Sequence, residues 1–214
     1  MSEFLRNLFG RGKGRSAQGP NEKELVDRIR SGDVEAFELL LDRHQERITR
    51  LVLSILKNPM DAEEVVQDVF LTVFEKIDRF REEASFSTWI HRIAVNAALM
   101  RRRKLKPGVD ISLDDVLPAF DDQGQIAAQV HDWSQQIGDP VLQEEAIGVI
   151  QTAVDKLDEK YQSVFVLRDV QGFSTAETAA ILDLGVPAVK SRLHRARLFL
   201  RGELAAYFDR EDKQ

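Results

Sequence analysis

The chain has 214 residues, enough for one or two domains with a buried core, and its formal net charge is −6. It contains no cysteine, which excludes disulfide bonds and thiolate metal sites, and its four histidines lack the spacing of metal ligands. No apolar run approaches the roughly 20 residues that a membrane-spanning helix needs. We therefore expect a globular protein of a reducing compartment, with no metal and no other cofactor.

The N-terminal half begins with a basic extension and continues as a helical domain. Residues 1–20 are basic and rich in glycine, and their apolar core is too short for a signal peptide, so they predict a flexible extension. In the domain at 21–104, helix starts are indicated by a capping residue followed three positions later by a glutamate. Such pairs begin at Asn21 and Asp61, and Asp33 starts a further helix between them.

The helix predicted from Asp61 has two contrasting sides. Valine, phenylalanine and isoleucine recur at helical spacing from Val65 to Ile77 and form a stripe for the core. The opposite side carries acidic and amide groups with one leucine, at Asp61, Glu64, Gln67, Asp68 and Leu71. Acidic groups in a first turn complement the helix dipole, so ordinary solvation explains this side as well as a docking face for a basic helical partner does.

The segment from Phe80 to Lys104 predicts a helix that combines aromatic residues with arginines. The residues expected to face the core are Phe86, Trp89, Ile90, Ile93, Ala94, Ala97 and Met100. The residues expected on the opposite side are Arg92, Val95, Asn96, Leu99 and Arg103. Aromatic rings beside amides and arginines can stack on an unpaired base and hydrogen-bond to it. Phe86 and Trp89 are by default core residues, so both interpretations stay open.

Residues 105–138 differ in composition and predict a flexible acidic linker. Between 107 and 140 there is no lysine or arginine, and seven aspartates give a local charge of −7. Glycine and proline interrupt any regular pattern, which is typical of a segment that is partly disordered. Such a polyanionic segment should avoid DNA and lie instead in a basic channel.

A second helical domain is predicted at 139–208, followed by a frayed tail at 209–214. Its first helices are expected at 141–157 and from Asp158 onward. The residues of the latter helix that should pack beneath the last two helices are Val164, Phe165, Leu167 and Val170. These helices are therefore predicted to support the segment that follows, at 174–201.

That following segment, 174–201, predicts a helix-turn-helix. Ser174 with Glu177 indicates the start of one helix, and Pro187 opens the next after a turn at 183–185. The predicted buried stripe of the second helix is Val186, Val189, Leu193, Ala196 and Leu200, and its other faces carry Lys190, Ser191, Arg192, His194, Arg195, Arg197 and Arg201 without an acidic residue. A helix of this kind fits the major groove of DNA, whereas the simpler interpretation is a hairpin with a solvated basic face.

Three stretches together resemble one protein family. They are DAEEVVQDVFLTVFEKIDRF, FSTWIHRIAVNAALMRRRK and EKYQSVFVLRDVQGFSTAETAAILDLGVPAVKSRLHRARLFLR. In this order and separation they are similar to the extracytoplasmic-function sigma factors, which are bacterial RNA polymerase initiation subunits of the sigma-70 family. The resemblance covers about residues 22 to 204. It implies an all-α fold of two small helical domains, sigma region 2 and sigma region 4, joined by the flexible acidic linker.

The resemblance also implies roles for individual residues. The expected polymerase-binding residues are Asp61, Glu64, Gln67, Asp68 and Leu71. The expected contacts to the −10 element, in the melted strand, are Ser85, Phe86, Trp89, Arg92, Asn96 and Arg103. The expected contacts to the −35 element are Ser174, Thr175, Lys190, Ser191, Arg192, His194, Arg195 and Arg197, of which Arg192 and Arg197 suit phosphates or packing better than bases.

The functional expectation is a sigma factor that binds core RNA polymerase, recognises duplex −35 DNA and favours a strand-separated −10 element. We find no nucleophile–base pair, no phosphate-binding glycine loop and no metal cluster in the sequence, so we expect no enzymatic activity. The resemblance implies a location in the bacterial cytoplasm and a dedicated anti-sigma partner, often at the inner membrane. The alternative is a stand-alone helix-turn-helix repressor or activator, which would bind duplex DNA without polymerase.

Overall fold

The computed structural model describes residues 20–105 and 140–211, with side chains from 148 to 203 in the second range. The N-terminal extension and nearly all of the acidic linker expected from the sequence lie outside the described residues. The two described ranges consist of helices joined by short connections, and no strand occurs in them. Among these helices, none is long and apolar enough to cross a lipid bilayer.

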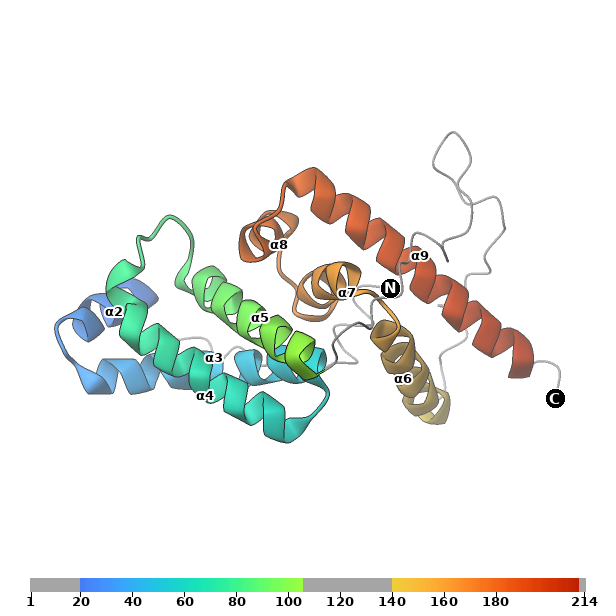
Figure 1. Cartoon of the computed structure of the whole chain (residues 1–214), viewed down its shortest axis with the longest axis horizontal. Helices are drawn as coiled ribbons and strands as arrows, with labels where there is room; N and C mark the ends of the chain where they lie inside the picture. The colour runs from blue at the N-terminus through green and yellow to red at the C-terminus, as the bar shows by residue number, and fades with distance from the viewer. Residues whose placement is uncertain (1–19, 106–139, 212–214) are drawn as a thin grey trace.

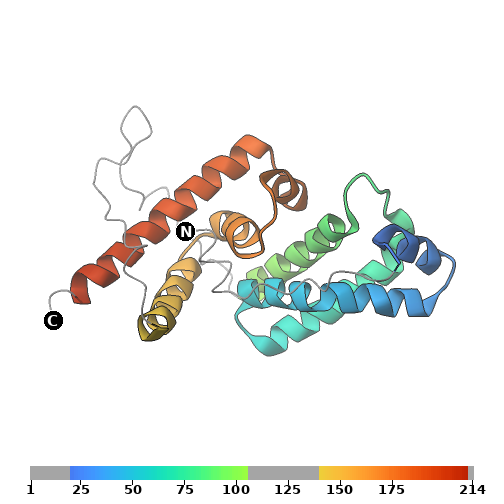
Figure 2. The same cartoon turned by 180° about the vertical axis from the view of Figure 1, so that it is seen from behind.

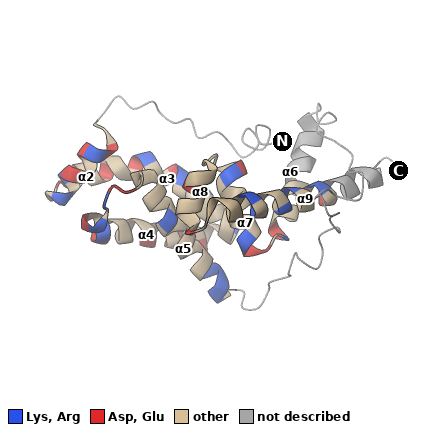
Figure 3. Cartoon of the chain, turned by 90° about the horizontal axis from the view of Figure 1, so that it is seen from above, with Lys and Arg blue, Asp and Glu red and all other residues tan. Residues whose placement is uncertain are grey.

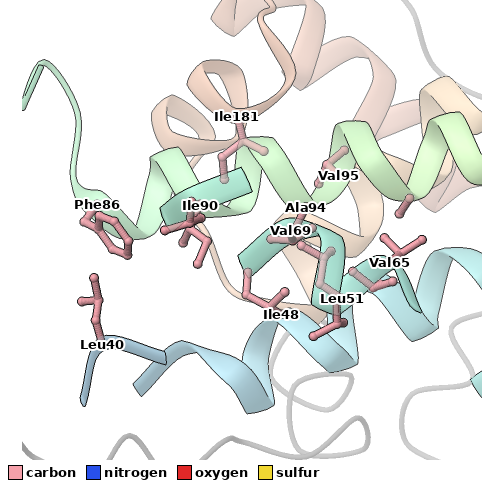
Figure 4. Packing of buried hydrophobic residues seen from close by; sticks show 14 of the residues in the cluster. Leu40, Ile48, Leu51, Val65, Val69, Phe86, Ile90, Ala94, Val95 and Ile181 are labelled. Carbon is pink, nitrogen blue, oxygen red and sulfur yellow. The ribbon is translucent and has the colours of Figure 1, made fainter. Parts of the chain in front are cut away.

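The first range folds into what we call the N-terminal unit, in which α3, α4 and α5 pack on one another around a common core (Figure 1). The short α2 lies against α3 and closes one end of the unit. The elements of the unit are α2 (Glu22–Arg30), α3 (Val34–Leu56), α4 (Pro59–Lys76), the 3₁₀ turn η1 (Ile77–Arg79) and α5 (Phe86–Leu105). Figure 4 shows the apolar side chains of α3, α4 and α5 converging on this core.

The second range folds into the C-terminal unit, in which α6, α7 and α8 each pack against the long α9. Its elements are α6 (Pro140–Asp155), α7 (Glu159–Phe165), the π-helical turn η4 (Val166–Val170), α8 (Thr175–Leu182) and α9 (Val186–Glu211). Seen from behind in Figure 2, the two units lie side by side, with α8 next to α5 and α9 extending away from the N-terminal unit. Helix α9 runs to Glu211, so the helix continues into the tail that the sequence predicted to fray from 209.

Most helix starts follow the predicted capping chemistry, with one correction. The capping boxes of Asn21 with Glu24 and of Ser174 with Glu177 are both formed, each with two reciprocal hydrogen bonds. The start of α4 is different, because Asn58 and not Asp61 is its N-cap residue. The Asn58 side chain accepts hydrogen bonds from the first free amides, and Pro59 occupies the first helical position, where its missing N–H costs nothing.

The predicted turn at 183–185, between α8 and α9, begins with an aspartate in the left-handed conformation. Asp183 has a φ of 56° in the left-handed region and donates its backbone N–H to the Ala179 carbonyl. Aspartate tolerates this conformation better than most side chains do. Of the predicted stripe on α9, Val189, Leu193, Ala196 and Leu200 are buried, but Val186 is 39% exposed at the start of the helix.

The two units share a hydrophobic core, which the sequence did not predict. Four side chains of the C-terminal unit belong to the buried cluster of the N-terminal unit, namely Val166, Leu167, Phe173 and Ile181. Leu167 lies in this shared cluster together with Ile181 of α8, whereas Val164 and Phe165 belong to the core of the C-terminal unit. In Figure 4, Ile181 points from α8 toward α5.

The contact between the units also explains two errors in the predicted faces of α5. Val95 was placed on the outer face, yet it is only 1% exposed, and Leu99 on the same face is half-buried against the shared core. Met100, predicted to point inward, is 58% exposed. The outer apolar residues of α5 are buried because α8 lies over them.

Candidate nucleic-acid interface

Helix α9 presents an exposed basic and polar face beside its buried stripe. Lys190, Ser191 and His194 are exposed, and they lie at spacings of one, three and four residues on one side of the helix. No acidic residue occurs between Val186 and Arg201, so the whole N-terminal half of α9 is free of negative side chains. An exposed helix face of this width and charge can enter the major groove of DNA.

The two arginines that flank this face are partly engaged within the protein. Arg195 is half-buried, and its Nη1 lies 3.3 Å from the Tyr161 hydroxyl on α7. Arg192 is half-buried as well and lines a cleft of about 470 Å³ between the units. A guanidinium that already contacts a neighbour loses less conformational freedom when it binds a base. The contact with Tyr161 therefore orients the Arg195 side chain before DNA binds.

Arg197, the last residue of the predicted DNA-contacting set, is committed to a structural ion pair. Its Nε and Nη2 donate to the two carboxylate oxygens of Asp169 at 2.8 and 2.7 Å. Asp169 is only 1% exposed, and its hydrogen bonds hold the pKa of the arginine above its usual value. This arrangement commits Nε and one N–H of Nη2 to packing, one of the two roles expected from the sequence.

Ser174 and Thr175 stand at the start of α8. The Ser174 hydroxyl accepts from the backbone N–H of Glu177, and the Glu177 carboxylate accepts from the Ser174 N–H. These bonds lower the pKa of Glu177. Ser174 is exposed and Thr175 is half-buried, so both remain near the surface while fixing the first turn of the helix-turn-helix.

In the N-terminal unit, the aromatic residues at the start of α5 form a packed cluster. The Phe86 ring lies 5.6 Å from that of Phe80 and 5.7 Å from that of Trp89, and Phe86 is only 3% exposed. Trp89 is half-buried at the edge of this cluster. The Ser85 hydroxyl accepts from the Thr88 N–H and thus caps the helix. Phe86 is a core residue in this structure, and Trp89 is the aromatic ring nearest to the surface.

The polar side of α5 faces the C-terminal unit across the same cleft. Asn96 and Arg103 line it from α5. Arg92 and Asn96 are both exposed, and Arg92 pairs with Asp183 at 3.6 Å. The Arg103 guanidinium pairs with Glu159 at the start of α7. Figure 3 shows that the C-terminal end of α5 is a block of basic residues.

The acidic side of α4 is exposed except at its N-terminal end. Glu64, Gln67 and Asp68 are exposed, and Leu71 is 61% exposed. Asp61 is different, because its carboxylate accepts two hydrogen bonds from Arg101 on α5, at 3.0 and 2.6 Å. The sequence-predicted docking residues thus form one surface, but Asp61 also fastens α4 to α5.

Sequence reasoning missed the partners of these residues, Arg101 and Asp169 above all. Arg101 carries no separate signal in the sequence, because it stands in a run of basic residues at the end of α5. Asp169 did carry a signal, because it is an acidic residue in the mostly apolar stretch VFVLRDV and, if buried, needs a cation as partner. Among the described residues, no group of acidic residues or histidines is arranged to hold a metal ion.

Comparison with known proteins identifies the class to which this arrangement belongs. Two family models match the chain, Sigma-70 region 2 at residues 40–107 and Sigma-70, region 4 at residues 147–200. The ECF RNA polymerase sigma factor SigW of Bacillus subtilis is 34% identical over 188 residues, which cover 85% of this chain and 96% of the relative. The ECF RNA polymerase sigma-E factor of Escherichia coli K12 is 33% identical over 184 residues, or 82% and 90% of the two chains.

The chain therefore belongs to the ECF RNA polymerase sigma factors. As a sigma factor, it binds core RNA polymerase and promoter DNA and directs promoter-specific initiation. Membership of this family favours that function over the alternative of a stand-alone repressor or activator. Sigma factors are non-catalytic initiation factors. The predicted all-α fold with region 2 and region 4 is confirmed.

Solved structures agree with the fold. CnrH, solved in complex with the cytosolic domain of CnrY, superposes with a TM-score of 0.62 at 25% identity and covers 86% of this chain and 97% of its own. The sigma factor RpoE from Bartonella quintana, solved with the anti-sigma factor NepR, gives a TM-score of 0.56 at 24% identity, over 78% and 96% of the two chains.

Proposed function

We propose that the two helical units divide promoter recognition between them, with α9 reading the −35 element and α5 holding the opened −10 element. The observation that carries this assignment is the exposed row of Lys190, Ser191 and His194 on a helix half that contains no acid. Arg195 lies beside this row with its guanidinium steadied by Tyr161. Ser174 and Thr175 would approach the backbone at the start of α8, where free amides favour a phosphate.

For the −10 element we propose Arg92, Asn96 and Arg103 as contacts, with Trp89 at the edge of the aromatic cluster. Their exposed amide and guanidinium groups lie on one side of α5 and can donate to bases and phosphates of a single strand. Flipping a base out of a stack costs a few kcal/mol, which a fitted pocket must offset. Ser85 and Phe86 would support this surface by fixing the start of α5.

For core polymerase we propose the α4 surface of Glu64, Gln67, Asp68 and Leu71. An exposed leucine among acidic and amide groups suits a basic helical partner, because it adds apolar contact to charge complementarity. Asp61 contributes to this surface through the Arg101 pair, which sets the position of the first turn of α4. The Asp68→Lys variant should lose affinity for core polymerase, whereas Glu35→Lys, exposed on α3, should not.

We further propose that the chain acts without catalytic activity of its own, in the bacterial cytoplasm, under an anti-sigma factor. The support is that RpoE, which shares this fold, was solved with the anti-sigma factor NepR. The acidic linker of 105–138, which lies outside the described residues except for residue 105, is the proposed tether between the two units.

The deciding experiment is transcription by core polymerase reconstituted with this chain on a randomised promoter library. We expect start sites that share a −35 and a −10 sequence and that vanish without the chain. A chain that binds duplex DNA tightly alone, and leaves start sites unchanged, would instead be a stand-alone regulator. The same holoenzyme also tests the −10 assignment, since Asn96→Ala should impair duplex promoters more than templates already opened at −10, while Gln151→Ala on α6 should affect neither.

A further inference from the structure

The connection between η1 and α5 contains a backbone conformation that is unusual for its residue type. Residues 80–85 form this connection, which projects above α2 and α5 in Figure 1. Among the described residues, Lys57, Glu82 and Asp183 are the non-glycine residues with positive φ, and the φ of Glu82 is 58°. Lys57 and Asp183 cap the C-terminal ends of helices, where this conformation is common, whereas Glu82 lies inside the loop. Glutamate rarely adopts it, so the surrounding structure must hold Glu82 in place.

Two cations of α2 contact this loop. The Lys23 Nζ lies 3.0 Å from one carboxylate oxygen of Glu82, and the Arg30 Nη1 lies 3.8 Å from the other. The Arg30 Nη2 also donates to the backbone carbonyl of Phe80, two residues before Glu82. Asp27, one turn earlier on α2, accepts from the same guanidinium at 3.2 Å and restrains it. Helix α2 therefore holds the loop at a main-chain carbonyl and at a side chain.

The residue whose carbonyl Arg30 contacts belongs to the aromatic cluster at the start of α5. Phe80 is only 6% exposed, and its ring lies 5.3 Å from that of Trp89. The other end of the loop is fixed by Ser85, whose hydroxyl accepts from the Thr88 N–H. The −10 surface proposed above includes Trp89 and depends on Ser85 for the start of α5. A shift of the loop would therefore shift the edge of that surface.

The same ion pairs alter the charge beside the proposed −10 surface. Glu82 and Glu83 are adjacent and exposed, and a nucleic-acid strand at this surface brings phosphates of the same sign. At physiological ionic strength such repulsion is screened only beyond about 8 Å. Lys23 and Arg30 compensate the Glu82 carboxylate and hold it against α2. Their removal would leave that charge uncompensated next to the strand.

We propose that Lys23 and Arg30 are positioning residues for the −10 element, which act through the loop and do not themselves touch DNA. The proposal rests on the −10 assignment above. Helix α2 keeps Glu82 in its left-handed conformation, and this conformation fixes Ser85 and Trp89 at the edge of the surface that receives an unpaired base. Exposed ion pairs add little to stability, so loss of the Lys23 pair alters the loop and not the fold. Helix α2 thereby influences base selection from outside the contact surface.

The lack of cysteine allows the loop to be observed directly in the full chain. A nitroxide label on Ala84→Cys, exposed in the loop, reports loop motion by electron paramagnetic resonance. We expect a restricted label in the otherwise natural chain, and Lys23→Ala should raise the mobile fraction about two- to fivefold, the range of an exposed pair. Arg28→Ala is the matched control, because Arg28 is an exposed cation of the same helix that pairs with Asp33 at 2.8 Å. Equal mobility in all three chains would overturn the proposal.

A charge exchange separates positioning from direct contact with DNA. Lys23→Glu should mobilise the label and weaken −10 selection, and the double variant Lys23→Glu with Glu82→Lys should restore both. An exchange that restores neither would contradict the ion-pair mechanism. Arg30→Lys is a second test, because an ammonium replaces the planar guanidinium that contacts the loop carbonyl and carboxylate together. This variant should mobilise the label while its helical circular dichroism stays unchanged.

Base selection is measured with the holoenzyme on templates already opened at −10, so that strand opening does not enter the comparison. Lys23→Ala and Arg30→Lys should each reduce discrimination among single-base variants at one −10 position about two- to fivefold. Discrimination among −35 variants and affinity for core polymerase should stay unchanged. Unchanged −10 discrimination would refute the proposal. So would a uniform loss on all −10 templates with a smaller salt dependence, because these cations would then bind phosphates.

Failure of the proposed function would look different from failure of this proposal. In that case the natural holoenzyme would show no −10 preference at all, whereas the nitroxide label would still report whether α2 holds the loop.

Discussion

The guanidinium of Arg197 and the carboxylate of Asp169 meet through two parallel hydrogen bonds of 2.8 and 2.7 Å, which join α9 to the π-helical turn η4. Asp169 is buried, whereas the side chain of Arg197 is 37% exposed. A two-point pair of this kind fixes distance and orientation together. The pair therefore fixes the position and orientation of the N-terminal half of α9 relative to the rest of the C-terminal unit.

We predict that Arg197→Ala destabilises the C-terminal unit by about 2–3 kcal/mol, because the Asp169 carboxylate would remain buried without a partner. Chemical denaturation followed by circular dichroism measures this change. Lys190→Ala, exposed on the same helix, is the matched control and should leave stability unchanged. If Arg197→Ala folds normally but loses DNA affinity evenly across sequences, Arg197 is a phosphate contact instead.

The Asp61–Arg101 pair leads to a second prediction, which separates docking from folding on α4. Asp61→Asn should lower the midpoint of thermal unfolding by a few degrees, because it weakens two charge-assisted hydrogen bonds to α5. Asp68 is exposed about two turns further along α4, so Asp68→Asn should leave the midpoint unchanged and weaken only polymerase binding. Equal thermal effects of the two substitutions would show that Asp61 has no special structural role.

A third prediction concerns His91, which is fully buried in the contact between the units. Its Nδ1 donates to the Ser87 carbonyl at 2.6 Å, and burial beside Phe173 lowers its pKa from 6.5 to about 4. The unfolded chain therefore binds a proton near pH 6.5 that the folded chain does not accept until about pH 4. Stability from this group is complete above pH 6.5 and is lost as the pH falls toward 4.

The expected loss between pH 7.5 and 5 is about 2 kcal/mol in the free energy of unfolding. Arg47 and His44 face the ring and lower the pKa of His91 further, while Glu22 raises it. Glu22 itself has a lowered pKa through its hydrogen bond with His44, so its contribution is lost only below pH 4.5 and does not overlap this window. Denaturation of His91→Gln at both pH values is the control. An unchanged pH dependence in that variant would assign the effect to another group.

Local signals were sufficient to predict most helices and the helix-turn-helix. Asn21 and Ser174 indicate the starts of their helices because their side chains accept hydrogen bonds from backbone amides three residues later. Such bonds depend on the nearby sequence alone. Asp61 failed as a cap because Asn58 with Pro59 offered a better start three residues earlier. The exposed row on α9 was predicted for the same reason, since an acid-free helical face is visible in the sequence.

Contacts between distant segments could not be predicted from helical periodicity. Val95 looked like an outward residue of α5, yet it is buried in the shared core, and Leu167 of the C-terminal unit lies in the same core. Their burial depends on how the two units pack on each other. An apolar residue on an outer helix face indicates that something covers it, but the sequence pattern does not identify the segment that does so. Ile181, its counterpart on α8, was not recognised at all.

The final prediction tests whether Arg195 reads a base in the −35 element. In the holoenzyme, Arg195→Ala should cost about 1–3 kcal/mol at one −35 base pair and relax preference at that position alone. Competition binding over a set of single-base −35 variants measures this. Lys190→Ala, if it removes a phosphate contact, should weaken all sequences alike and reduce the salt dependence of binding by about one ion.

Tyr161→Phe provides the matched control for this prediction, because it removes only the hydroxyl that lies 3.3 Å from the Arg195 guanidinium. If the tyrosine positions the arginine, Tyr161→Phe should reproduce part of the loss at the same base pair, and it should add nothing further in the Arg195→Ala background. A uniform loss across all −35 variants in Arg195→Ala would reassign this arginine to the DNA backbone, and base selection would then rest with Ser191 and His194 on the exposed row.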